Sequence, residues 1–418
     1  MELKPLSVLK YMSNTNDSID VSKEYENRLN GVATFKTNLY PYLTDKYGEQ
    51  HDNYPIFFIE TRDLSILSAD IYKKSRKIEQ LSNSLPGIAK SSYANSLLTN
   101  EIQFSNEIEG VKTKREEIGT IVDDLQNNNN TNQKRLVSTV QKYLDILNIN
   151  RPEIKINSFD DLRVIYDRLT AGEIDLDKLP DGEYFRNSPV RIGTSLETVH
   201  TPPANEKLIE NKLSTLISFM NNEKIPPIEK SLITHFMFEN THPFSDGNGR
   251  MGRYLLSQYL GKKIDPFTAL SISGSIHENQ QKYYKIFKEA DKYENYGELT
   301  FFIHEMMRLI LDSQNEVLNR MNQLLETLNE YKNNLKIILK IEDEHDTEFE
   351  ILLIFVESKL FNIDSSLGIK DTDLINMLYR EDTKKYKKVK VKGIINKYEE
   401  KGILQKINGK PLQHEIII

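Results

Sequence analysis

The 418-residue chain has neither cysteine nor tryptophan. The missing cysteine excludes a disulfide scaffold, a thiol nucleophile, a cysteine-ligated zinc and an iron–sulfur site. No apolar run approaches the ~20 residues that a membrane span needs. The first residues also lack the apolar segment of about 7–15 residues that marks a secretory signal. We therefore expect a soluble, cytoplasmic protein with no membrane partner.

Neither sign of charge is in large excess, because the net charge is only −7. This argues against nucleic-acid binding by the chain as a whole, although a local basic patch stays open. Hydrophobic residues make up 38% of the sequence, with 21 tyrosines and 17 phenylalanines. That content is enough for packed cores and excludes general disorder.

The spacing of apolar residues predicts a mainly α-helical protein of two or more domains. We expect an N-terminal helical region at 1–100, a core at 101–311, a linker helix at 312–345 and a C-terminal module at 346–418. Within the core, the stretch 184–203 is an exception and predicts a short β-hairpin or flap.

The end of the chain has two features of its own. From Val317 the apolar residues alternate spacings of four and three, which is typical of a long helix that links domains or pairs chains. The module at 346–418 then has the order of a winged helix-turn-helix, three helices followed by a hairpin. Its run of lysines leaves DNA binding through 384–410 open. We favour protein docking or regulation instead, because lysines supply charge without base readout.

One segment, from His242 to Arg253, contains candidate catalytic and ligand-binding residues. Gly247 and Gly249 allow a sharp turn and close approach of a ligand to the backbone. A helix is expected to start just after them, so that its N–H groups form an anion site. Arg250 and Arg253 are three residues apart on that helix and could both reach phosphates.

Two further residues of this segment complete the predicted site. Asp246 offers a hard oxygen of the kind that Mg²⁺ accepts. His242 has an ordinary pKa of ~6.5 and is a candidate general base for a hydroxyl group. Together they predict a Mg²⁺-nucleotide site for nucleotidyl or phosphoryl transfer onto an alcohol. The alternative is an ordinary glycine turn with solvated arginines and a core histidine, and the joint arrangement disfavours it.

The same segment, HPFSDGNGRMGR, resembles the signature H-P-F-x-[D/E]-G-N-G-R-x-x-R of the Fic family and matches it at every fixed position. The resemblance implies a Fic helical core that transfers AMP from ATP to a Ser, Thr or Tyr hydroxyl of a target protein. It assigns His242 as the base and Asp246 as the Mg²⁺ ligand. The residues implied in ATP binding are Phe244 as a packing anchor, Gly247, Asn248, Gly249, Arg250 and Arg253. Relatives that phosphorylate carry a lysine in place of Gly249, so the glycine favours AMP transfer.

A second match lies upstream, where Ser105–Gly110 fits [S/T]-x-x-x-E-[G/N] and resembles the inhibitory motif of the same family. In that interpretation Glu109 pairs with Arg253 and keeps this arginine from the γ-phosphate. The alternative is that Glu109 is simply a polar residue near a helix end.

Weaker resemblances concern the flap and the base pocket. Ile192, Gly193 and Thr194 lie where the family flap presents its target, and Tyr284 with Phe287 would enclose the adenine. The other histidines show no metal-ligand spacing and were assigned to no site.

Three alternatives stay open at this point. The chain could be a winged-helix DNA-binding regulator with a nucleotide-sensing Fic core. It could transfer a different nucleotide or remove AMP from modified proteins, or it could be an inactive scaffold. Self-inhibited relatives are often dimers, so a homodimer is open as well.

Overall fold

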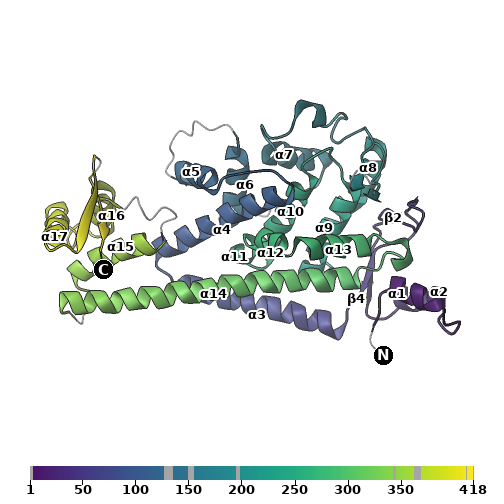
Figure 1. Ribbon diagram of the computed structural model, residues 1–418, viewed down its shortest axis with the longest axis horizontal. Helices are drawn as coiled ribbons and strands as arrows, with labels where there is room; N and C mark the ends of the chain where they lie inside the picture. The colour runs from purple at the N-terminus through teal and green to yellow at the C-terminus, as the bar shows by residue number, and fades with distance from the viewer. Residues whose placement is uncertain are drawn as a thin grey trace. The chain divides into compact units, whose positions relative to one another are not determined.

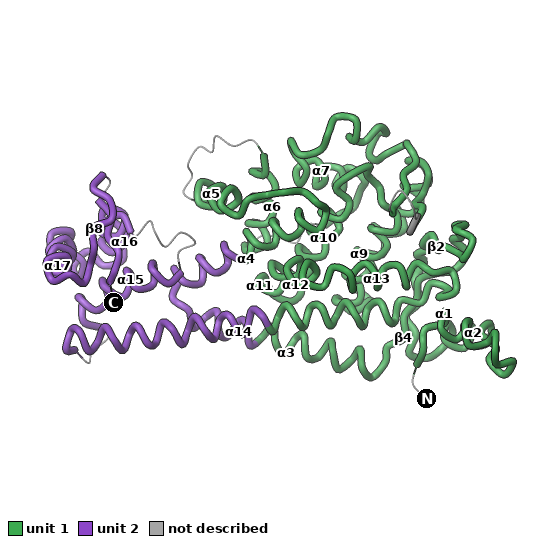
Figure 2. Tube along the Cα trace, in the orientation of Figure 1, with its two compact units in different colours: residues 1–76, 97–315 green, residues 77–96, 316–418 purple. Residues whose placement is uncertain are grey.

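The computed structural model describes residues 3–126, 135–148, 155–193, 198–341, 345–361, 369–410 and 412–417. This described part is mainly helical (Figure 1), as expected. It divides into two compact units, drawn in two colours in Figure 2. The first contains residues 1–76 and 97–315, and the second contains residues 77–96 and 316–418. Among the described residues, every helix is too short or too polar to cross a lipid bilayer.

The N-terminal region contains strands that the sequence analysis did not predict. Its elements are α1 (Leu6–Ser13), α2 (Val21–Leu29), β1 (Thr34–Lys36), β2 (Leu43–Thr44), β3 (Gln50–His51), β4 (Phe57–Ile59) and α3 (Arg62–Ser84). β1 pairs antiparallel with β4, and β2 pairs antiparallel with β3. The strands have two or three residues each, which is too short for an alternating pattern to be visible in the sequence.

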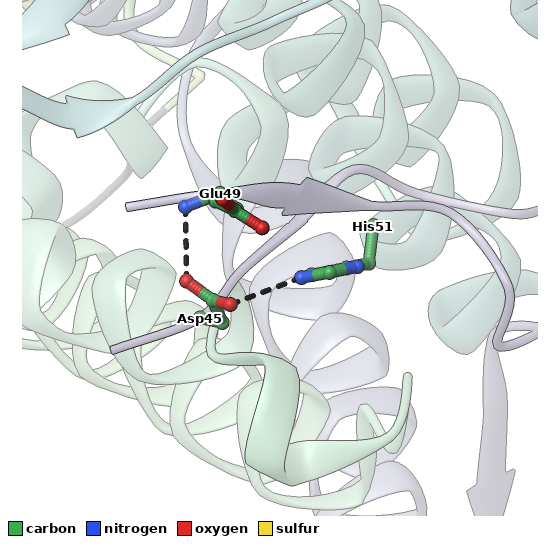
Figure 3. A group of neighbouring side chains, drawn as sticks. All are labelled: Asp45, Glu49 and His51. Carbon is green, nitrogen blue, oxygen red and sulfur yellow. Dashed lines mark hydrogen bonds and ion pairs between the residues drawn. The ribbon is translucent and has the colours of Figure 1, made fainter. Parts of the chain in front are cut away.

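The β2–β3 hairpin brings Asp45, Glu49 and His51 together (Figure 3). Oδ1 of Asp45 accepts a hydrogen bond from the backbone N–H of Glu49 at 2.9 Å, and Oδ2 lies 3.1 Å from Nε2 of His51. Although burial acts against it, the bond to His51 and the turn amides hold the pKa of Asp45 below its ordinary value. These bonds stabilise the turn, which accounts for the proximity of the three side chains.

The rest of the first unit is a helical core. Its elements are α4 (Gly87–Ile108, from residue 97 on), α5 (Arg115–Gln126), α6 (Val137–Leu147), α7 (Phe159–Leu169), η1 (Leu176–Lys178), β5 (Ile192–Gly193), β6 (Thr198–His200), α8 (Glu206–Met220), α9 (Pro227–Thr241), α10 (Asn248–Lys263), α11 (Pro266–Ala269), α12 (Ile272–Glu278), α13 (Gln280–Ala290), η2 (Tyr293–Asn295) and the start of α14 (Thr300–Leu339).

The helices α9 and α10 lie at the centre of this core and are buried on nearly all sides. Pro227 at the first turn of α9 has no N–H to leave unpaired, which suits a helix start. α10 begins at Asn248, so that Gly249 belongs to its first turn and does not precede it as predicted. The loop between the two buried helices, 242–247, is consequently fixed at both ends.

The second unit contains the rest of α14 together with α15 (Thr347–Phe361), β7 (Ile369–Lys370), α16 (Asp371–Glu381), α17 (Lys388–Glu400), β8 (Leu404–Gly409) and β9 (Leu412–Ile416). The strands form one antiparallel sheet in the order β7-β9-β8. α14 is a single helix of 40 residues, and its buried side chains at Val317, Met321, Leu324 and Leu328 follow the predicted spacing. Three helices and a hairpin occur in the expected order, and the assignment as a winged helix-turn-helix stays a prediction.

Part of the lysine run in the second unit is paired within the unit. Lys385 lies 2.6 Å from Glu350 of α15, and Lys397 lies 2.6 Å from Glu348 of the same helix. The other lysines of the run are exposed, namely Lys384, Lys387, Lys388, Lys390 and Lys392. The positive charge near α17 is therefore partly balanced by α15.

Candidate active site

The loop between α9 and α10 places His242 in a strained backbone conformation. α9 ends at Thr241, and His242 takes the left-handed region with φ +46°, its N–H donating to the carbonyl of Phe238 at 2.9 Å. A left-handed residue other than glycine costs free energy, and such residues gather at functional sites. Gly247, with φ +81°, turns the chain back into α10 at no such cost.

The side chains of Phe244 and Asn248 hold this loop in shape, as the packing role expected for Phe244 implies. The Asn248 amide accepts from the Phe244 N–H at 2.9 Å and donates to the Phe244 carbonyl at 2.7 Å. The Phe244 ring is fully buried and stacks on Tyr166, with ring centroids 3.6 Å apart. Phe244 is thus a packing residue. The side-chain amide of Asn248 is already bonded to Phe244, so its backbone N–H is the group left for a ligand.

Beside His242 lies a cavity of about 480 Å³. Its lining includes these predicted residues: Glu109, Ile192, Gly193, His242, Gly249, Arg253, Tyr284 and Phe287. Thr194, the third predicted flap residue, lies outside the described residues. The structure therefore brings the base, the second arginine, the inhibitory motif and the aromatic pocket to one place, although they are far apart in the sequence.

Arg253 is held by the segment that contains the inhibitory motif. Its Nε donates to Oγ of Ser105 at 3.0 Å, and its Nη2 donates to the Ser105 carbonyl at 2.8 Å and to Oε1 of Glu109 at 2.9 Å. The guanidinium is buried, with 1% of the side chain exposed. Burial acts to lower the pKa of Arg253, but Glu109 and its neighbours outweigh this and raise it above its ordinary value. Arg253 is therefore a fixed positive charge that already has an anionic partner.

Gly249 leaves the space that Glu109 occupies. A Cβ at residue 249 would overlap the Glu109 carboxylate and would crowd Nη1 of Arg253 at 2.9 Å. Only glycine allows the carboxylate this close to the start of α10, whose N–H groups attract anions. Glu109 thus lies where the sequence analysis placed phosphates.

His242 is a neutral imidazole in this environment. Burial lowers its pKa to about 3, and the positive charge of Arg186 and the ring of His200 act in the same direction. Its Nδ1 is buried and has no hydrogen-bond partner among the described residues. A neutral imidazole that lines the cavity has one unprotonated ring nitrogen, which can accept a proton from a ligand hydroxyl.

The predicted metal ligand faces two cations. Oδ2 of Asp246 lies 3.4 Å from Nζ of Lys178, and its Oδ1 lies 3.9 Å from Nη2 of Arg250. Its side chain is 36% exposed. A single accessible carboxylate fits Mg²⁺, which keeps several waters and is shared with substrate phosphates. Neither Asp246 nor Arg250 lines the cavity, and together with Lys178 they form a separate charged group.

Arg250 has a partner that the sequence analysis missed. Its Nη1 pairs with the buried carboxylate of Glu173, which also lies 3.3 Å from Nε of Arg135. Glu173 and Lys178 come from the segment after α7, about 70 residues before the signature. No sequence signal could have placed them here, because only tertiary packing makes them neighbours.

The structure adds cavity residues that were not predicted, among them Glu239 and His200. Burial raises the pKa of Glu239 to about 8, and the nearby charge of Glu109 adds to the effect. Glu239 precedes His242 by three residues on α9, a helical spacing that could have indicated a shared face. His200, assigned to no site, lies on the cavity with its Nε2 at 2.8 Å from the Asn240 carbonyl.

The aromatic part of the cavity comes from α13. Tyr283 is buried and its hydroxyl lies 2.8 Å from Nε2 of His235, while Tyr284 is 49% exposed and donates to the Ile108 carbonyl at 3.2 Å. Phe287 packs edge-on against Tyr283, with centroids 5.0 Å apart. These rings form an apolar wall of the kind that encloses a planar base.

The flap is a two-stranded hairpin. β5 pairs with β6 through Ile192 opposite His200 and Gly193 opposite Thr198. The chain leading into it is anchored by Glu206, whose carboxylate accepts three backbone N–H bonds, from residues 183, 184 and 185, at 2.6 to 2.9 Å. Glu206 therefore fixes the base of the flap next to the cavity.

Replacing Glu206 by glutamine is expected to destabilise the fold at neutral pH only. Although burial acts to raise the pKa of Glu206, its three amide donors hold it below the ordinary value. A lowered folded pKa stabilises above the unfolded pKa, and this stability is lost as the pH falls through the folded pKa. Thermal unfolding should show a loss of about 1 kcal/mol at pH 7, a low figure because the carboxylate is partly solvated. The loss should shrink below about pH 4. An equal loss at pH 3 and pH 7 would contradict the assignment, and Glu210→Gln is the control.

Comparisons with known proteins find a family match and relatives of part of this chain. A family model described as Fic/DOC family matches residues 157–260. A probable protein adenylyltransferase of Aquifex aeolicus is 31% identical over 129 residues, which are 31% of this chain and 35% of that protein. A protein adenylyltransferase of Caenorhabditis briggsae is 29% identical over 149 residues, which are 35% of this chain and 26% of that protein. The chain thus spans about a third or less of the length of these relatives.

A solved structure is similar over a longer stretch. The crystal structure of a Fic family protein from Desulfovibrio desulfuricans G20 matches with a TM-score of 0.49 and 19% identity. The match covers 85% of this chain and 96% of that one.

Proposed function

Because residues 157–260 form a Fic domain, we propose that the chain is a protein adenylyltransferase, which transfers AMP from ATP to a Ser, Thr or Tyr hydroxyl of a target protein. The observation that carries the proposal is the neutral His242, which lines the same cavity as Arg253 and the aromatic wall of α13. The relatives from Aquifex aeolicus and Caenorhabditis briggsae, which match part of this chain, are named as a probable protein adenylyltransferase and a protein adenylyltransferase, and these names support the same activity.

The residues divide the reaction between them. His242 takes the proton of the target hydroxyl, and the hydroxyl oxygen forms a bond to the α-phosphorus of ATP. The bond from the α-phosphorus to the bridging oxygen breaks, and pyrophosphate leaves with that electron pair. Arg250 and Arg253 bind the departing phosphates, and Asp246 would hold Mg²⁺, which neutralises their charge when bound. Tyr284 and Phe287 enclose the base.

The resting chain is self-inhibited in this proposal. Glu109 occupies Arg253 and the start of α10, so that the γ-phosphate has no free guanidinium. Two unit charges at ~4 Å attract by about 4 kcal/mol at an effective dielectric near 20, before desolvation costs. A partly buried pair can therefore compete with a phosphate contact.

The DNA-binding regulator is the less favoured alternative. Lys385 and Lys397 are paired with glutamates of α15, which reduces the positive charge available to phosphates. For the second unit we propose docking of a protein partner, and the oligomeric state of the chain, a homodimer included, is left to measurement.

The position of the label in ATP tests the proposed transfer. Glu109→Gly protein with Mg²⁺ is expected to label protein from ATP carrying radioactive α-phosphorus, but not from ATP carrying radioactive γ-phosphorus, because pyrophosphate leaves. Chelation of the metal should remove the label. Mass spectrometry should find AMP on the modified peptide. Label from the γ-position would instead indicate phosphorylation, and no label from α-labelled ATP, CTP, GTP or UTP would overturn the proposal.

A further inference from the structure

Arg186 is a buried charge at the base of the flap. Its side chain is fully buried, and its Nη2 has no hydrogen-bond partner among the described residues. Burial lowers the pKa of Arg186 to about 10, and Asp181 opposes this from a distance. A guanidinium with an unsatisfied donor is costly to bury, so its place in the core calls for a reason.

The hydrogen bonds of Arg186 run to carbonyl groups around the active-site loop. Its Nε donates to the carbonyl of His242 at 2.9 Å, and its backbone N–H donates to the carbonyl of Pro243 at 3.0 Å. Nη1 donates to the Ser188 carbonyl at 3.0 Å. His242 is the residue with φ +46°. Arg186 therefore links the start of the flap to His242, which has the strained backbone conformation and serves as the proposed general base.

The charge of Arg186 also acts on the His242 ring. After burial, it is the strongest of the influences that keep the ring unprotonated, and His200 follows. The other titratable groups that line the cavity with His242 are Glu109, Glu239, Arg253, Tyr283, Tyr284, Lys288 and Asp291. A nearby positive charge favours the neutral form of the ring, which is the form that can accept a proton.

We propose that Arg186 is a positioning residue for the base. It holds the backbone of His242 through the Nε bond and acts on the ring through its charge, without touching the nucleotide, since it does not line the cavity. The inference rests on the proposed function for the role of His242 in the reaction. Its physical content, the effect of Arg186 on His242, can be measured in the protein without nucleotide.

Two substitutions separate the charge from the shape of Arg186. Arg186→Gln keeps an N–H donor and loses the charge, whereas Arg186→Lys keeps the charge and loses the guanidinium. NMR titration of the His242 ring is expected to give a half-protonation pH about one unit higher in the glutamine variant than in the lysine variant. In the Glu109→Gly background, the glutamine variant should lower kcat about tenfold and leave the KM for ATP within about twofold.

Arg163→Gln is the matched control. Arg163 also donates to backbone carbonyls of the flap base, at residues 183 and 184, but it does not contact His242. Equal titration of His242 in the glutamine and lysine variants would overturn the inference, as would an equal shift in the Arg163 variant. If the glutamine variant fails to fold, the lysine variant is compared with the parent protein. A raised half-protonation pH of His242 in the lysine variant overturns the inference, and an unchanged value supports it. A Glu109→Gly protein that labels nothing would overturn the proposed function alone, because the NMR result still decides the effect of Arg186.

Discussion

His242→Ala in the Glu109→Gly background is expected to lower AMP transfer at least a thousandfold. His242 is a neutral imidazole that lines the cavity, and alanine leaves the target hydroxyl with no base. General base catalysis contributes about 10² to 10⁴-fold, and the ring also orients the attacking oxygen. The measurement is the initial rate of label transfer from ATP carrying radioactive α-phosphorus.

The affinity for ATP and a substitution of a second histidine serve as controls for this result. ATP affinity should stay within about threefold of the parent, because the phosphate contacts proposed for Arg250 and Arg253 do not involve His242. His304→Ala is a suitable control, since His304 is paired with Glu305 and does not line the cavity. Transfer above a tenth of the parent rate in His242→Ala would mean that another group serves as the base.

Glu109→Gly is expected to raise AMP transfer by the wild-type chain about ten- to a hundredfold. The substitution removes the carboxylate from Arg253 and from the start of α10, so that the γ-phosphate can take both places. A charge-assisted contact of this kind, partly buried, is worth about 1.5–3 kcal/mol, which converts to roughly 13- to 160-fold. The rate of self-labelling and the affinity for ATP should both be measured.

Glu107→Gly is the matched control for this activation. Glu107 is two residues away at the same end of α4, but its carboxylate lies 3.2 Å from His277 and does not contact Arg253. The glycine therefore loosens the helix end equally and leaves the Glu109–Arg253 pair in place. Equal activation by both variants would show that helix loosening, not the lost charge, is responsible. No activation by Glu109→Gly would remove the basis for self-inhibition.

The sequence analysis located the signature loop well because its chemistry is local. Gly247, Asn248 and Gly249 are neighbours in the chain, and the turn that they make depends on their own backbone preferences. The pairing of Glu109 with Arg253 was predicted from the resemblance and is present in the structure. The mainly helical class was confirmed because helical spacing repeats over many residues.

Other parts of the prediction failed where the pattern was short or the partner distant. The N-terminal strands were missed since two or three residues give no period. Glu173 and Lys178 were missed as partners of Arg250 and Asp246, because only folding brings them next to the signature.

By itself, then, the sequence determined the helical class, the loop from His242 to Arg253 and the chemistry of its side chains, since these follow from neighbouring residues. The tertiary structure alone decided that Glu173 holds Arg250, that Lys178 faces Asp246 and that Arg186 donates to the His242 carbonyl. These contacts join residues about 55 to 80 positions apart. No spacing rule relates such residues, because their distance depends on how whole helices pack.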